Sequence, residues 1–139
     1  VLFVDLDGFK SVNDSFGHEA GDRLLKEAAR RLLASVRETD TVARHGGDEF
    51  TVVLTDVADP NAVTTIARKI IEALAQPFKL HDDEARIGAS IGVALQSTIG
   101  DKPEELLERA DAAMYVAKQD GKNTYSYAAK GGGKRSAAA

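Results

Sequence analysis

Hydrophobic positions divide this chain into short apolar runs and longer segments with a helical repeat. Residues 1–6 are mostly apolar and lead into acids, which predicts a buried central strand. Residues 8–22 mix glycine, asparagine and aspartate, a composition that predicts a short helical turn with loops. In residues 19–36 apolar side chains recur every three or four positions, which predicts a helix with one buried face.

The rest of the chain also alternates between strand-like segments and segments with a helical repeat. Residues 41–44 and 49–54 are strand-like and flank a Gly-Gly pair, which predicts a β-hairpin. Asp59 and Pro60 predict a helix start, and the apolar repeat after them stops before Pro77. A strand over residues 85–95, a helix after Pro103 and a last strand over residues 124–128 complete the order β-α-β-β-α-β-α-β. This order predicts an α+β sandwich, with a mostly antiparallel central sheet covered by helices.

Composition narrows the class of protein. The chain has 139 residues, a net charge of −4 and no cysteine. It fits one domain over residues 1–128, followed by a flexible or artificial tail over residues 129–139. The net negative charge argues against a general nucleic-acid or membrane-surface binder, and without cysteine there are no disulfides. We expect a cytoplasmic setting, and because Val1 opens inside an apolar run we expect an N-terminally truncated piece.

Two pairs of acids carry the chemical signal. Asp5 and Asp7 end the first predicted strand on one face, and Asp48 and Glu49 follow the Gly-Gly pair. Spacing does not decide whether Asp5 or Asp7 turns toward the hairpin. Two carboxylates about 4 Å apart repel by roughly 4 kcal/mol near a protein surface, so such a cluster needs a shared proton or a cation. Oxygen ligands of this kind suit Mg²⁺, although a solvated sheet edge also explains both pairs.

Four segments resemble the GGDEF family, the diguanylate cyclases. They are DLDGFKSVNDSFGHEAGD (residues 5–22), RHGGDEF (44–50), ASIGVA (89–94) and ADAAMYVAKQDGKN (110–123). The resemblance covers residues 1 to about 127. It implies a nucleotide-cyclase fold, a palm-like (ferredoxin-like) α/β sandwich, which agrees with the predicted order of elements.

The resemblance also implies a reaction and a metal site. Members of the family condense two GTP molecules into cyclic di-GMP and release two pyrophosphates, using Mg²⁺ or Mn²⁺. By resemblance, Asp5 and Asp48 ligate the metal together with the backbone carbonyl of Leu6. Glu49 lies next to the metal and assists removal of the proton from the attacking 3′-hydroxyl.

The implied substrate-binding residues face either the guanine base or the rest of the nucleotide. They are Asn13 and Asp22 at the guanine, and Phe9, Lys10, Gly46, Gly47, Lys118 and Lys122 elsewhere. Each also has a simpler explanation, as a turn, a helix start or a solvated helix end. Lys122 stands where the family usually has arginine, and because lysine lacks the bidentate fork we expect weaker nucleotide binding.

An R-x-x-D motif is formed by Arg37 and Asp40, and five residues separate it from the Gly-Gly pair. Its place resembles the family's inhibitory site for the product cyclic di-GMP, to which Arg68 is expected to contribute. An exposed arginine at a helix end, followed by a turn aspartate, is the simpler explanation. A symmetric product made from two identical nucleotides also implies a homodimer, which an upstream regulatory domain, expected but not present in this sequence, assembles in the family.

Two other functions stay open at this stage. The chain could be a signalling module that binds GTP or cyclic di-GMP without turnover, or an interaction domain whose acids are surface charge. The intact turn over residues 46–50 favours the enzyme over the binding module. The matching guanine and phosphate positions disfavour the interaction domain.

Overall fold

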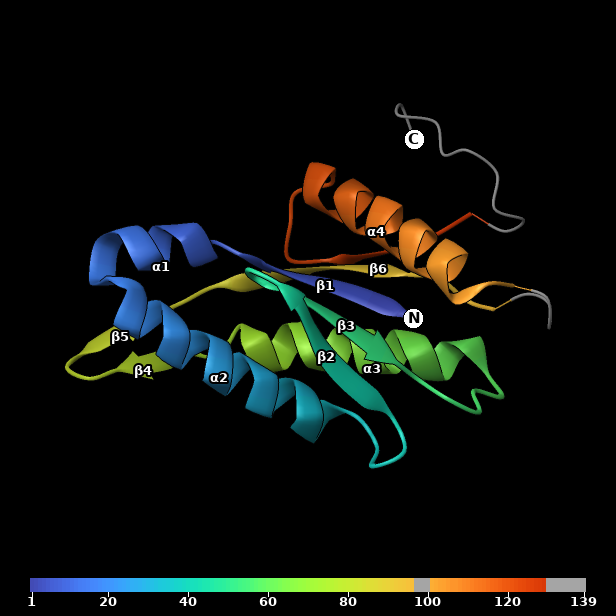
Figure 1. The fold of residues 1–139 in the computed structure, drawn as a ribbon, viewed down its shortest axis with the longest axis horizontal. Coiled ribbons are helices and arrows are strands. Elements are labelled where there is room, and N and C mark those ends of the chain that lie inside the picture. The colour runs from blue at the N-terminus through green and yellow to red at the C-terminus, as the bar shows by residue number, and fades with distance from the viewer. Residues whose placement is uncertain (97–100, 130–139) are drawn as a thin grey trace.

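A computed structural model describes residues 1–96 and 101–129, which form a five-stranded sheet covered by helices (Figure 1). The strands lie in the order β2 (Thr41–Gly46), β3 (Glu49–Val53), β1 (Leu2–Asp7), β6 (Gly88–Val93) and β7 (Tyr125–Tyr127). Neighbouring strands are antiparallel except β6 and β7, which are parallel. The predicted mostly antiparallel sheet is therefore confirmed. The predicted tail lies, from residue 130 onward, outside the described residues.

Helices cover both faces of this sheet. In the described residues they are α1 (Phe9–Phe16), α2 (His18–Ser35), α3 (Pro60–Leu74) and α4 (Pro103–Gln119). Helices α2 and α3 lie on one side of the sheet and α4 on the other (Figure 1). The alternation of β1 explains this arrangement, since Leu2 and Val4 join the core beneath α2 and α3 while Phe3 packs against Met114 of α4. The predicted α+β sandwich is confirmed.

The helix starts follow the signals in the sequence. The Asp59 side chain accepts a hydrogen bond from the Asn61 amide at 3.0 Å, with Pro60 as the first helical residue of α3. Helix α2 has both ends within one residue of the predicted range. Within the described part of the chain, no helix combines the length and apolar character needed to span a membrane.

Two predictions about secondary structure were wrong. The segment after β1 is a complete helix of eight residues, α1, which Phe9 and Val12 anchor in the core, and not a short helical turn. The expected single strand over residues 85–95 is divided, because Ala85 ends a separate ribbon of β4 (Phe78–Leu80) and β5 (Asp83–Ala85). Strands of three residues are too short to show a repeat, and two of the three residues of β5 are exposed acids.

Helix α4 rests directly on the backbone of β6 at Gly92. A Cβ atom at this position would lie 1.8 Å from the carbonyl oxygen of Ala110 and 2.3 Å from the amide nitrogen of Met114. Both contacts are with backbone, which cannot rotate away as a side chain can. The absence of a side chain at Gly92 therefore fixes the height of α4 above the sheet.

Candidate active site

Strand pairing brings the two pairs of acids together. Asp5 of β1 lies directly opposite Glu49 of β3, and the Leu6 amide donates to the Asp48 carbonyl at 3.1 Å. Asp7 lies farther along β1 and pairs with Gly88 of β6 instead. The question that spacing left open is thus answered: Asp5 is the aspartate beside the hairpin.

The turn that carries Asp48 is held by its own strand. Arg44 donates from Nε and Nη2 to the carbonyl oxygen of Gly47, at 3.0 and 2.8 Å. Gly47 has a φ of 51°, in the left-handed region that glycine adopts readily, and the strand register shifts between Arg44 and Gly46. The hairpin therefore presents Asp48 and Glu49 in a defined place next to β1.

Lys118 of α4 lies between the two aspartates of β1. Its Nζ is 3.1 Å from Asp5 Oδ2 and 3.3 Å from Asp7 Oδ1. Burial by itself would lower the pKa of Lys118, but its hydrogen bonds to both carboxylates outweigh burial, so that its pKa is raised. Lys118, which was predicted to bind phosphate, is thus charged and lies beside the carboxylates of Asp5 and Asp7.

Asp5 is left with an incomplete set of partners. Burial raises its pKa to about 6, the hydrogen bond from Lys118 opposes this rise, and the charges of Asp48 and Glu49 add to it. Its Oδ1 atom is buried and has no hydrogen-bond partner among the described residues. A buried carboxylate oxygen without a partner is costly, and either a proton or a cation would satisfy it.

These groups fit part of the coordination shell of Mg²⁺. Asp5, Asp48 and the Leu6 carbonyl offer hard oxygen atoms at one end of β1. Within residues 1–96 and 101–129, no three or more histidine, cysteine or acidic side chains form a ready-made metal cluster. Mg²⁺ commonly binds through one or two carboxylates and takes its other ligands from phosphates and water, so the residues present fit a cation that arrives with a nucleotide.

Asp7 and Ser90 are a buried pair that sequence reasoning did not assign to the site. The Ser90 hydroxyl donates to both carboxylate oxygens of Asp7, at 2.8 and 2.9 Å, and it is fully buried. A signal was present, because Ser90 is a polar residue in an otherwise apolar strand, within the ASIGVA segment. What the sequence alone did not give was its partner, 83 positions away.

The two predicted guanine-binding residues, Asn13 and Asp22, lie near the junction of α1 and α2. The side chain of Asn13 lies over Gly21, at which a Cβ would be only 1.8 Å from Asn13 Oδ1. Asp22 is the next residue of α2 and is exposed. The lack of a side chain at Gly21 therefore allows the amide of Asn13 to lie against α2, at the residue before Asp22.

Three further nucleotide-binding candidates lie at the start of α1 and after the end of α4. Phe9 and Lys10 begin α1, directly after Gly8, and no side chain caps their end of the helix. The first amides of a helix lack partners within the helix, so they suit an anionic group. Lys122 is exposed and lies beyond α4, in a left-handed conformation with a φ of 64°.

The arginine and the aspartate of the R-x-x-D motif are hydrogen-bonded to each other. Arg37 donates to the carboxylate of Asp40 from Nε, Nη2 and its backbone amide at 2.9–3.0 Å, and the Thr55 amide adds a bond of 3.3 Å. The Asp40 side chain is fully buried, and the hydrogen bond from Arg37 lowers its pKa. Arg68 lies on α3, where its Nη2 donates to the Tyr125 hydroxyl at 3.3 Å.

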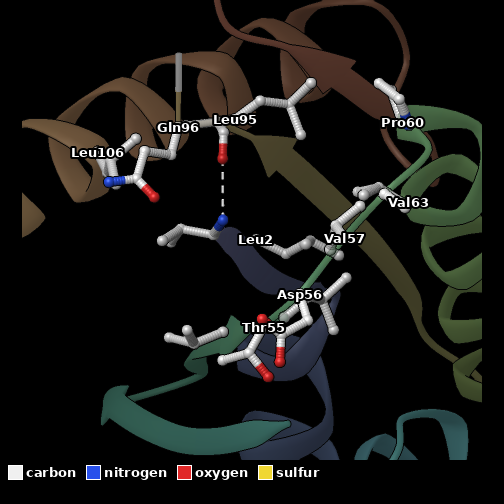
Figure 2. Close-up of a pocket in the computed structure, with 14 residues that line it drawn as sticks. Leu2, Thr55, Asp56, Val57, Pro60, Val63, Leu95, Gln96 and Leu106 are labelled. Atoms are coloured by element: carbon white, nitrogen blue, oxygen red, sulfur yellow. Dashed lines mark hydrogen bonds between the residues drawn. The ribbon is translucent and has the colours of Figure 1, made fainter. Parts of the chain in front are cut away.

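A cavity of about 550 Å³ lies at the other end of β1 (Figure 2). Thr55, Asp56, Leu95 and Leu106 are among its lining residues, and the Val1 amino group there donates to the Ala94 carbonyl at 2.8 Å. A strand advances about 3.3 Å per residue, so this cavity is well separated from the acids at the end of β1. It is not part of the candidate active site.

Comparisons with known proteins find one family over most of the chain. Residues 1–124 match the sequence model of the family described as "Diguanylate cyclase, GGDEF domain". The bifunctional diguanylate cyclase/cyclic di-GMP phosphodiesterase MucR of Pseudomonas aeruginosa is 50% identical over 127 residues. That alignment covers 91% of this chain and 18% of MucR, so the chain spans less than a fifth of this relative.

Solved structures show the same fold. The crystal structure of the GGDEF domain of TpbB from Pseudomonas aeruginosa has a TM-score of 0.88 and 41% identity, and the match covers 92% of this chain and 80% of that one. The GGDEF domain of DgcB from Caulobacter crescentus, solved in complex with c-di-GMP, has a TM-score of 0.82 and 28% identity. Its match covers 91% of this chain and 75% of that one.

Replacing Asp5→Asn is expected to stabilise the metal-free domain at neutral pH. The pKa of Asp5 in the folded state, about 6, exceeds its usual 3.8, so this carboxyl favours folding while protonated and loses that contribution as the pH rises from about 4 through 6. We expect the variant to be about 1–2 kcal/mol more stable than the wild type at pH 7.5, with the difference vanishing below pH 4. Urea unfolding in EDTA measures this, and a less stable variant at pH 7.5 contradicts it.

Proposed function

Because the chain belongs to the GGDEF family of diguanylate cyclase domains, we propose that it condenses two GTP molecules into cyclic di-GMP. In each of two steps the 3′-oxygen of one nucleotide forms a bond to the α-phosphorus of the other, and the bond from that phosphorus to pyrophosphate breaks. The observation that carries the proposal is the pairing of Asp5 with the Asp48–Glu49 turn, next to a buried carboxylate oxygen that has no partner within residues 1–96 and 101–129. We place this reaction in the cytoplasm, where GTP is available.

The acids at the end of β1 have separate roles in this proposal. Asp5, Asp48 and the Leu6 carbonyl would hold Mg²⁺ or Mn²⁺. When bound, such a cation lowers the pKa of the attacking hydroxyl and neutralises charge on the α-phosphate and on the departing pyrophosphate. Glu49 lies opposite Asp5 and accepts the proton of the 3′-hydroxyl.

The rest of the nucleotide lies along α1, α2 and the end of α4. Asp22 accepts from the N1–H and N2–H₂ donors of guanine, and the amide of Asn13 donates to O6. Six residues contact the sugar and phosphates in this proposal: Phe9, Lys10, Gly46, Gly47, Lys118 and Lys122. The position of Lys118 between two carboxylates supports it, because the same ammonium can turn from Asp5 toward a phosphate when a cation occupies Asp5.

Two copies of the domain are needed for ring closure. The product has two-fold symmetry and each bond joins one nucleotide to the other, so two half-sites facing each other supply both attacking groups. A single domain would bind GTP without completing the reaction. We therefore propose that the active species is a homodimer.

Cyclic di-GMP is proposed to inhibit this domain at Arg37, Asp40 and Arg68. The Arg37 side chain is half exposed, so its guanidinium can pair with phosphate or stack on guanine while it remains bonded to Asp40. The DgcB structure supports binding of the product by this fold, since that domain was solved with c-di-GMP. Arg68 contacts Tyr125, and would have to turn toward the ligand from there.

The Asp48→Ala variant tests the catalytic proposal. We expect cyclic dinucleotide and pyrophosphate formation from GTP and Mg²⁺ to fall at least about 100-fold, because charge stabilisation by a bound cation contributes several kcal/mol. Asp82→Ala, an exposed acid in the turn between β4 and β5, is the matched control and should retain activity. A wild-type protein that retains GTP but releases neither product is instead a binding module.

Dilution tests the dimer. Specific activity should fall as the protein is diluted below micromolar concentrations, because the fraction of dimer decreases. Rates measured over a hundredfold range of protein concentration, with sedimentation at the same concentrations, make the comparison. A constant specific activity in a monomeric sample contradicts the proposal.

The Arg37→Ala variant tests the inhibitory site. Its affinity for cyclic di-GMP in calorimetry should fall at least about tenfold, since charge-assisted pairs to phosphate are lost. Arg30→Ala, an exposed arginine paired with Glu27 on α2, is the control and should bind as the wild type does. Unchanged product affinity in a folded Arg37→Ala variant places the inhibitory site elsewhere.

A further inference from the structure

The loop after α4 has an unusual conformation, and one carboxylate of β1 bonds to its backbone. Gly121, Lys122 and Asn123 have consecutive positive φ values of 114°, 64° and 50°. Left-handed backbone is unfavourable for lysine and better tolerated by asparagine, so this loop needs support from its surroundings. The Asn123 amide donates to Asp7 Oδ2 at 2.9 Å, and this bond joins the loop to β1 across 116 positions of sequence.

The side chain of Asn123 completes the attachment to the sheet. Its Oδ1 accepts from the Ala89 amide at 3.4 Å, and a Cβ at Gly88 would lie 2.9 Å from this atom. The loop is therefore fixed to β1 through Asp7 and to β6 through Asn123. Lys122 is adjacent to this attachment, and its own backbone amide donates to the Ala117 carbonyl of α4 at 3.1 Å.

Asp7 and Asp5 lie on one face of β1 but have different partners. Both oxygens of Asp7 accept hydrogen bonds, from Ser90, from Lys118 and from the Asn123 amide. Asp5 has Lys118 on one oxygen and, among the described residues, no partner on the other. Asp7 is therefore already satisfied by the protein, whereas Asp5 is the carboxylate that can still accept a cation.

We propose that Asp7 is a positioning residue that holds Lys118 and Lys122 in the phosphate site once a cation has taken Asp5. A cation on Asp5 repels the nearby ammonium of Lys118, which keeps its second bond, to Asp7. The same carboxylate holds the loop that presents Lys122. This inference rests on the proposed function, because it assigns the two lysines to the triphosphate of GTP.

A double-mutant cycle tests whether Asp7 acts through the lysines. The measurement is the Kd of a non-hydrolysable GTP analogue with Mg²⁺, by calorimetry. Asp7→Ala should weaken binding about tenfold in the wild-type background, but by less than about threefold when Lys118→Met and Lys122→Met are present, since coupled residues are not additive. An equal loss in both backgrounds, or wild-type affinity in a folded Asp7→Ala variant, overturns the proposal.

Hydrogen exchange gives a readout that needs no ligand. The Asn123 amide should exchange faster in Asp7→Ala than in the wild type, whereas Asp7→Asn should keep it protected because the new carbonyl still accepts. Unchanged exchange in Asp7→Ala shows that the carboxylate does not hold the loop, and overturns that half of the proposal.

Two serine variants, compared with each other, control for the loss of a buried hydroxyl group. Ser90→Ala removes a donor to Asp7 and should weaken binding of the analogue, whereas Ser35→Ala removes a buried hydroxyl that bonds to Arg31 and should leave binding unchanged. Equal weakening in both variants contradicts the positioning role. A wild-type protein that does not bind the analogue refutes the proposed function itself, and the exchange measurement still decides whether Asp7 holds the loop.

Discussion

The ion pair of Lys118 with Asp5 and Asp7 is the interaction on which this site depends. Strand β1 carries two aspartates into a largely buried position, and the hairpin adds Asp48 and Glu49 beside them. Buried charges without partners are strongly destabilising, so a cation from α4 is required for the sheet and the helix to pack as they do. One lysine does not balance four carboxylates. The negative charge that remains would attract a divalent cation to this end of the sheet.

Much of this arrangement could be predicted from the sequence, because it depends on local signals. Apolar repeats gave the long helices and the buried strand, and the Gly-Gly pair gave the hairpin. Spacing left open whether Asp5 or Asp7 lies beside the hairpin, and the pairing of Asp5 with Glu49 decides it. The ribbon of β4 and β5 was missed because each strand has only three residues, too few to show a repeat.

The role of Asp7 was missed for a different reason. Its partners Ser90 and Asn123 are 83 and 116 positions away, and no spacing rule connects residues so far apart. An aspartate at the end of a strand looks the same in sequence whether it faces a ligand or anchors a loop. Only the three-dimensional packing of α4 on β1 and β6 distinguishes the two, so the sequence offered candidate residues but not the contacts that separate Asp7 from Asp5.

The contact at Gly92 has a consequence for how such a domain can respond to a signal. Because the backbone of α4 touches the backbone of β6 there, the helix cannot settle closer to the sheet, and lifting it away would separate Lys118 from both aspartates. The helix, the sheet and the charges between them thus behave as one block. A displacement imposed from outside would therefore move the helix, the sheet and the charges together, with the interior left undisturbed.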